Sequence, residues 1–211
     1  AGHEVVMLSP VTFTALKNVT SKHARLILVP PNDFVRGYQR FQEETISTNL
    51  WTAKQGDPFF FIKPMENMTG YLAEHCRVIM DTPGLMDSLR AEQFDGAFSE
   101  CIDACGFGLF HLLGIKKFAV TQSMADIGRD AITGVPGLPS FQPALMSVSG
   151  DQMSFFERFS NLLCSLAWNH MIGVGLDGMQ TVFDERYNDF PRLEDIVKNA
   201  SYFFVNSEPL I

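Results

Sequence analysis

Short apolar runs alternate along the chain with longer segments of helical spacing. Apolar residues at three- and four-residue intervals predict helices between the runs, with a break at Thr82-Pro83-Gly84. The runs that predict strands lie at residues 5–10, 25–29, 94–99, 116–122 and 201–206. Five strands separated by helices predict an α/β fold with a doubly wound, mostly parallel sheet. We expect the last run, residues 201–206, to be a buried strand of this sheet.

Residues 94–123 form the most informative stretch. They read as a strand, an acidic turn, a helix over residues 104–113 and a second strand, which together make one βαβ unit. Ligands of parallel sheets bind beyond the carboxyl ends of the strands. Glu100 and Asp103 follow the first strand, and Gln122 and Ser123 end the second. These four residues are candidates for a site, and Phe107 on the helix is a further candidate for contact with a substrate.

Composition limits the class of protein. The 211 residues are 46% hydrophobic and 19% charged, as in an ordinary globular domain. The net charge of −8, without a basic block, argues against nucleic acid as the main partner. The 19 Phe and 10 Met residues suit an adaptable apolar pocket, although core packing accounts for most of them.

The four cysteines are Cys76, Cys101, Cys105 and Cys164. The Cys101–Cys105 spacing is not that of a redox CxxC motif, and no His or Cys cluster completes a zinc site. We therefore expect buried free thiols rather than disulfides, and no metal.

Three sequons and one uncharged stretch bear on the compartment. Asn18, Asn67 and Asn199 each begin an N-x-S/T sequence and are candidates for glycosylation in a lumenal or secreted chain. Residues 159–176 carry no Asp, Glu, Lys or Arg, but interrupting polar residues favour a largely buried or interface-lying helix over a membrane span. The first residues, Ala1 to Glu4, lack the charged and apolar pattern of a signal peptide, and the chain does not begin with Met, so we expect a piece of a longer protein.

Several ordered segments resemble the amino-terminal half of the UDP-glycosyltransferases of the UDP-glucuronosyltransferase type, particularly the nematode members. The resemblance covers most of the chain and is weakest over residues 32–64. It rests on these segments: AGHEVVMLSP, FDGAFSECIDACGFGLFHLLGIKKFAVTQS, GVPGLPSFQPALMS with QMSFFERFSNLL, and NASYFFVNSEPLI.

The resemblance implies the Rossmann-like amino-terminal domain of a GT-B glycosyltransferase, whose first strand would precede residue 1. Residues 1–211 would then be a single acceptor-binding domain fragment without its donor-binding domain. Such a fragment binds no cofactor and is inactive alone, with the UDP-sugar serving as co-substrate of the full-length enzyme.

The resemblance also implies roles for the acids. The family's general base is a His that lies upstream of this chain, so His3 does not take its role. The acid that orients this base falls at Glu100, where the family usually has Asp, and Asp103 is the rival. The structural alternative is a solvated loop acid or helix cap, and the cap explanation is the stronger one for Asp103.

The implied function is transfer of glucuronic acid or glucose from a UDP-sugar to a hydroxyl of small lipophilic molecules, with inversion, in detoxification. The implied setting is the lumenal side of the endoplasmic reticulum, in a single-pass glycoprotein anchored mostly through segments outside this chain, with self-association left open. The alternative is a non-catalytic small-molecule-binding or assembly domain.

Overall fold

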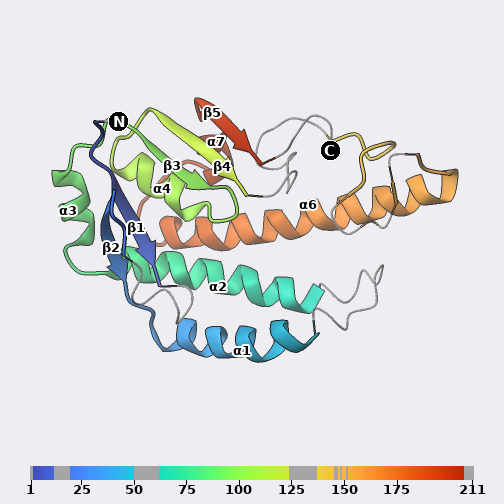
Figure 1. The fold of residues 1–211 in the computed structure, drawn as a ribbon, viewed down its shortest axis with the longest axis horizontal. Coiled ribbons are helices and arrows are strands. Elements are labelled where there is room, and N and C mark those ends of the chain that lie inside the picture. The colour runs from blue at the N-terminus through green and yellow to red at the C-terminus, as the bar shows by residue number, and fades with distance from the viewer. Residues whose placement is uncertain are drawn as a thin grey trace.

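The computed structural model describes residues 2–11, 20–49, 62–123, 137–144, 147, 149–150 and 152–206, with backbone only for 43–49 and 62–66. The described elements begin with two strands, and three helices then precede the third strand, so strands and helices do not alternate one by one (Figure 1). The strands are β1 (Val6–Pro10), β2 (Arg25–Val29), β3 (Ala97–Glu100), β4 (Phe118–Gln122) and β5 (Tyr202–Val205). The helices are α1 (Asp33–Asn49), α2 (Ile62–Asp81), α3 (Leu85–Ala91), α4 (Cys105–Leu112), α6 (Phe155–Asp184) and α7 (Leu193–Lys198).

All strand pairs in the described part of the chain are parallel. β1 pairs with β2, and β4 lies between β3 and β5 in a separate three-stranded sheet. The α/β class and the parallel pairing are therefore confirmed, and the architecture is an open, Rossmann-like one. The five strands nevertheless lie in two sheets rather than in one.

The central βαβ unit is confirmed as β3–α4–β4, with shorter elements than predicted. Gln93 adopts a positive φ of 53°, so the chain turns before it enters the sheet. Pairing starts where the amide of Ala97 donates to the carbonyl of Lys117, at 3.1 Å. The strand therefore begins at Ala97 instead of Phe94.

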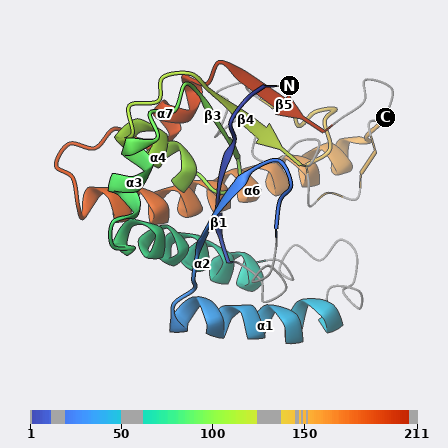
Figure 2. The same cartoon turned by 60° about the vertical axis from the view of Figure 1, so that its left-hand side comes forward.

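Helices pack in layers beneath the three-stranded sheet. α2 lies between α1 and α6, and both views show these three helices side by side (Figures 1 and 2). Glycines allow two of the close approaches. A Cβ added at Gly175 would lie 3.3 Å from Thr69, and one added at Gly108 of α4 would lie 2.2 Å from the ring of Phe183. The apolar core therefore lies between α2, α4, α6 and the sheet.

The predicted free thiols at Cys76 and Cys105 are wrong, because these two residues form a disulfide. They are 29 residues apart in sequence, but α2 and α4 bring their Cα atoms to 5.6 Å. Sequence spacing could not show this tertiary neighbour. Cys101 is buried and free, as expected, and Cys164 is free and half-buried.

The structure also shows how far two apolar segments are buried. α6 is one continuous helix that starts at Phe155 with a Ser154–Glu157 capping box. Within residues 159–176, predicted to be largely buried or interface-lying, the early turns are exposed, since Phe159 and Leu166 are 55% and 57% accessible. Strand β5 is likewise an exposed edge, with Tyr202 at 68%. Both segments therefore present large apolar side chains at the surface of the described structure.

No helix within the described residues has the length and apolar character needed to cross a membrane.

Candidate functional site

Glu100 joins the carboxyl ends of two neighbouring strands. Its Oε1 accepts a hydrogen bond from the backbone amide of Ser123, at 3.0 Å, and a longer one from the Ser123 hydroxyl, at 3.4 Å. Glu100 ends β3, and Ser123 directly follows β4, which pairs with it in parallel register. The predicted meeting of the two loops is therefore confirmed.

Asp103 lies on the same loop but faces the helices. Its Oδ1 accepts from the amide of Cys105, at 3.0 Å, at the start of α4. Its Oδ2 lies 3.7 Å from Nδ1 of His75, on α2. Asp103 therefore accepts from the first amide of α4, although Ala104 rather than Asp103 is the N-cap residue, and it lies beside an imidazole that the sequence did not reveal.

The third strand reaches the same edge of the sheet through Asn206. Its backbone amide donates to the carbonyl of Gln122, at 3.1 Å, and its side chain donates to the carbonyl of Ser123, at 3.2 Å. Gln122 itself is half-buried. Sequence reasoning missed Asn206, although its place directly after an apolar run was the available signal. The ends of β3, β4 and β5 thus form one polar edge.

Phe107 does not lie at this edge. Its side chain is fully buried, and its ring packs edge-on against Phe110, with ring centroids 5.7 Å apart. Its other aromatic neighbour is Phe118, at 5.8 Å. This position favours core packing for Phe107, and its contact with a substrate stays a prediction.

A low-dielectric layer lies beneath the acidic loop. Burial, followed by the neighbouring Glu100 carboxylate, raises the pKa of the Cys101 thiol to about 12. Burial, followed by the proximity of Tyr38 and Asp103, raises the pKa of Tyr71 to about 12. Both groups are therefore neutral near pH 7.

The chemistry open to this edge follows from its donors and acceptors. Carboxylates can orient an imidazole and stabilise the imidazolium that forms when it takes a proton. Among the described residues, no group of three or more His, Cys, Asp or Glu could hold a metal ion.

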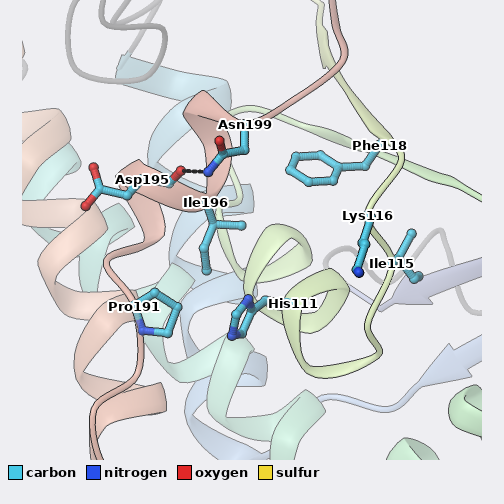
Figure 3. Close-up of a pocket in the computed structure, with 8 residues that line it drawn as sticks. All are labelled: His111, Ile115, Lys116, Phe118, Pro191, Asp195, Ile196 and Asn199. Carbon is cyan, nitrogen blue, oxygen red and sulfur yellow. Dashed lines mark hydrogen bonds between the residues drawn. The ribbon is translucent and has the colours of Figure 1, made fainter.

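A surface pocket lies at the opposite end of β4, where the strand begins (Figure 3). Its polar lining residues are His111, Lys116, Asp195 and Asn199, and Phe118 is one of its apolar walls. The candidate acids lie at the carboxyl end of the sheet instead, so this pocket is separate from them. Parallel sheets bind ligands at the carboxyl ends of their strands, which makes the pocket the weaker candidate for chemistry.

Two of the three sequons are exposed. Asn67 lies on α2 and Asn199 directly follows α7, where its side-chain amide donates to the carbonyl of Asp195 at 2.8 Å. Asn18 lies outside the described residues.

Comparison with known proteins gives a consistent result. A family model described as "UDP-glucoronosyl and UDP-glucosyl transferase" matches residues 1–207. UDP-glucuronosyltransferase ugt-47 of Caenorhabditis briggsae is 26% identical to this chain. The match covers 100% of this chain and 39% of the ugt-47 protein. UDP-glucuronosyltransferase 1A3 of Rattus norvegicus is 22% identical, over 98% of this chain and 39% of its own. No solved structure matches the chain significantly.

The chain spans about two-fifths of the length of these relatives. The family match covers nearly every residue, including the β3–α4–β4 unit with its two acids. The chain therefore belongs to the UDP-glucuronosyl and UDP-glucosyl transferase family.

Proposed function

We propose that this chain is the acceptor-binding part of an inverting UDP-glycosyltransferase, which transfers glucuronic acid or glucose to a hydroxyl of small lipophilic molecules. The observation that carries the proposal is the Glu100–Ser123 hydrogen bond, which holds a carboxylate at the carboxyl ends of β3 and β4. Family membership supplies the reaction class.

In this mechanism Glu100 orients an imidazole contributed by a segment outside this chain. The imidazole takes the proton of the acceptor hydroxyl, and the hydroxyl oxygen attacks the anomeric carbon of the sugar. The bond to UDP breaks, UDP leaves with its electron pair, and the configuration inverts. The carboxylate stabilises the imidazolium during the transfer.

The chain's other residues have narrower roles in this proposal. Ser123 and Gln122 border the acceptor, and the amide of Ser123 fixes one oxygen of Glu100. A UDP-sugar is the co-substrate and binds to a donor domain that follows this chain, so residues 1–211 alone are inactive.

The test is substitution of Glu100 in the full-length enzyme, assayed with a phenolic acceptor and either UDP-sugar. Glu100→Gln keeps the size and the acceptor oxygen but removes the charge, and we expect at least about a hundredfold loss of kcat with a native melting temperature. Asp87→Asn, on the surface of α3, is the matched control and should leave kcat unchanged. Wild-type turnover in Glu100→Gln and in Asp103→Asn would remove the orienting-acid assignment.

A non-catalytic binding or assembly domain is the second candidate function. One observation favours it: both acids already accept hydrogen bonds within the fold, Glu100 from Ser123 and Asp103 from the amide of Cys105. In that case the full-length protein would bind acceptor without turning over any UDP-sugar. Equilibrium binding of the phenol, measured beside turnover, separates the two functions.

The proposed compartment is the lumen of the endoplasmic reticulum. In this proposal the full-length protein crosses the membrane once, through a segment outside residues 1–211. The Cys76–Cys105 disulfide and the exposed sequons at Asn67 and Asn199 support an oxidising, glycosylating compartment. Endoglycosidase treatment of protein expressed in eukaryotic cells should shift its electrophoretic mobility, and Asn67→Gln with Asn199→Gln should reduce that shift.

A further inference from the structure

His75 is a buried polar side chain that the proposed reaction does not use. The residue is 3% accessible, and both of its ring nitrogens lack a hydrogen-bond partner among the described residues. A buried polar group without compensation destabilises the folded state, so an uncompensated imidazole in a core calls for an explanation.

The nearest compensating group is the carboxylate of Asp103. The distance between Nδ1 of His75 and Oδ2 of Asp103 is 3.7 Å, and Asp103 remains 30% accessible on its outer side. The His75 ring also stacks on Tyr71 with ring centroids 5.7 Å apart, and Tyr71 stacks on Tyr38 of α1 at 4.4 Å. The imidazole therefore lies beside both a column of aromatic rings and one acid.

Next to this contact is a covalent link between the same two segments. Cys76 follows His75 on α2, and its disulfide partner Cys105 opens α4. The amide of Cys105 donates to Oδ1 of Asp103, at 3.0 Å. One carboxylate thus accepts a hydrogen bond from α4 through one oxygen, and its other oxygen lies beside His75 of α2.

We propose that His75 is a positioning residue, which holds Asp103 against α2 and so fixes the acidic loop at residues 100–104. Asp103 is committed to an imidazole of its own fold, which leaves Glu100 as the carboxylate available to the imidazole of the active site. This inference rests on the proposed transferase function. At 3% accessibility, His75 itself touches neither acceptor nor donor.

A double-mutant cycle in the full-length enzyme tests the proposal, with His75→Phe, Asp103→Asn and the double variant. His75→Phe retains stacking on Tyr71 but removes the ring nitrogens. We expect kcat to fall about tenfold with KM changed less than about threefold, because loop position affects orientation more than binding. The double variant should lose no more than the worse single variant, and His75→Gln should restore part of the kcat. His170→Phe, at an exposed histidine of α6, is the matched control.

A second measurement does not depend on activity. Hydrogen exchange at the amide of Cys105 reports the Asp103 contact directly, and it should become at least about tenfold faster in His75→Phe while staying unchanged in His170→Phe. If the wild-type enzyme were inactive, the proposed transferase function would be wrong, but the exchange measurement at Cys105 would still test the contact between His75 and Asp103. Additive losses of kcat, or unchanged exchange at Cys105 in His75→Phe, would overturn the positioning role. If His75→Phe does not fold, His75→Leu, which also lacks ring nitrogens, takes its place in the cycle and in the exchange measurement, with the same criteria.

Discussion

The carboxylate of Glu100 accepts the backbone amide of Ser123 over 3.0 Å, and this bond ties the end of β3 to the loop that follows β4. The two residues are 23 positions apart in sequence. A parallel sheet places them side by side because both follow strands of the same direction. The carboxylate of Glu100 therefore has a structural role at the edge of the sheet, whether or not it takes part in a reaction.

The first prediction concerns this bond and the stability of the chain. Glu100→Ala removes the acceptor of a charge-assisted hydrogen bond at a partly exposed edge, so we expect the free energy of unfolding to fall by about 1–2 kcal/mol. Urea unfolding, followed by circular dichroism, measures this difference. The control is Asp87→Ala, because the side chain of Asp87 pairs with Arg90 on the surface of α3. This substitution should change the free energy of unfolding by less than about 0.5 kcal/mol. Equal effects of the two substitutions would mean that the Glu100 bond adds nothing to stability.

The second prediction concerns the Cys76–Cys105 disulfide. It closes a loop over a sequence separation of 29, and the chain-entropy model gives such a link about 3–4 kcal/mol. Cys76→Ser should therefore lower the free energy of unfolding by that order, and addition of a reductant should lower that of the wild type to a similar level.

Cys164→Ser is the control for the disulfide, because Cys164 is free. It should leave both the stability and its response to reductant unchanged. Intact-mass measurement with and without alkylation should find two fewer free thiols than cysteines, and four free thiols in the native protein would contradict the disulfide.

The sequence predicted the positions of the strands and helices better than it predicted their burial. Alternating apolar runs located all five strands, and β3–α4–β4 was placed to within three residues at each end. The local spacing of apolar residues is enough for such predictions, because strands and helices differ in the period at which apolar residues recur. Burial does not follow from local pattern, so the exposed edge of β5 was misjudged, and the sequence left open whether residues 159–176 were buried or interface-lying.

The candidate site shows the same division. Glu100 and Ser123 could be paired in advance, because parallel topology fixes where strand ends lie. His75 and Cys76 could not be assigned to Asp103 and Cys105, because these contacts depend on how α2 packs against α4. His75 stands within the apolar face of a helix, between Tyr71 and Ile79, and that unusual position was the one available signal.

The third prediction uses two glycines in different surroundings. A Cβ added at Gly108 would lie 2.2 Å from the Phe183 ring, so Gly108→Ala should overpack the core and lower the free energy of unfolding by about 1–3 kcal/mol. Gly173, within α6, has no atom within 4 Å of an added Cβ. Gly173→Ala should therefore stabilise the protein by about 0.5–1 kcal/mol through helix propensity. Thermal unfolding of both variants checks the opposite signs, and a neutral Gly108→Ala would refute the close packing of α4 on α6.

The fourth prediction concerns Cys101 and pH. Burial, followed by the Glu100 carboxylate, raises the pKa of this thiol from 9.0 to about 12, so the folded state keeps its proton more tightly than the unfolded state does. The stability from this group is present below about pH 9 and is lost as the pH rises towards 12. In native protein at pH 8, iodoacetamide should modify Cys164 well before Cys101, and denaturant should equalise the two rates. Rapid native modification of Cys101 would contradict its burial.

The fifth prediction concerns the exposed start of α6. Phe155 and Phe156 are 76% and 79% accessible, whereas Phe183 near the end of the same helix is fully buried. Phe155→Ser with Phe156→Ser should change the free energy of unfolding by no more than about 0.5 kcal/mol per substitution, while reducing self-association, because exposed apolar patches promote it.

Phe183→Ser provides the contrast within one helix. It removes a core ring that packs on Gly108, and it should lower the free energy of unfolding by about 3–5 kcal/mol. Sedimentation velocity beside thermal unfolding separates the two effects, since the double variant should change the mass distribution and the core variant the melting temperature. A double variant that melts far below the wild type would show that the first turn of α6 is packed, because only buried rings contribute that much.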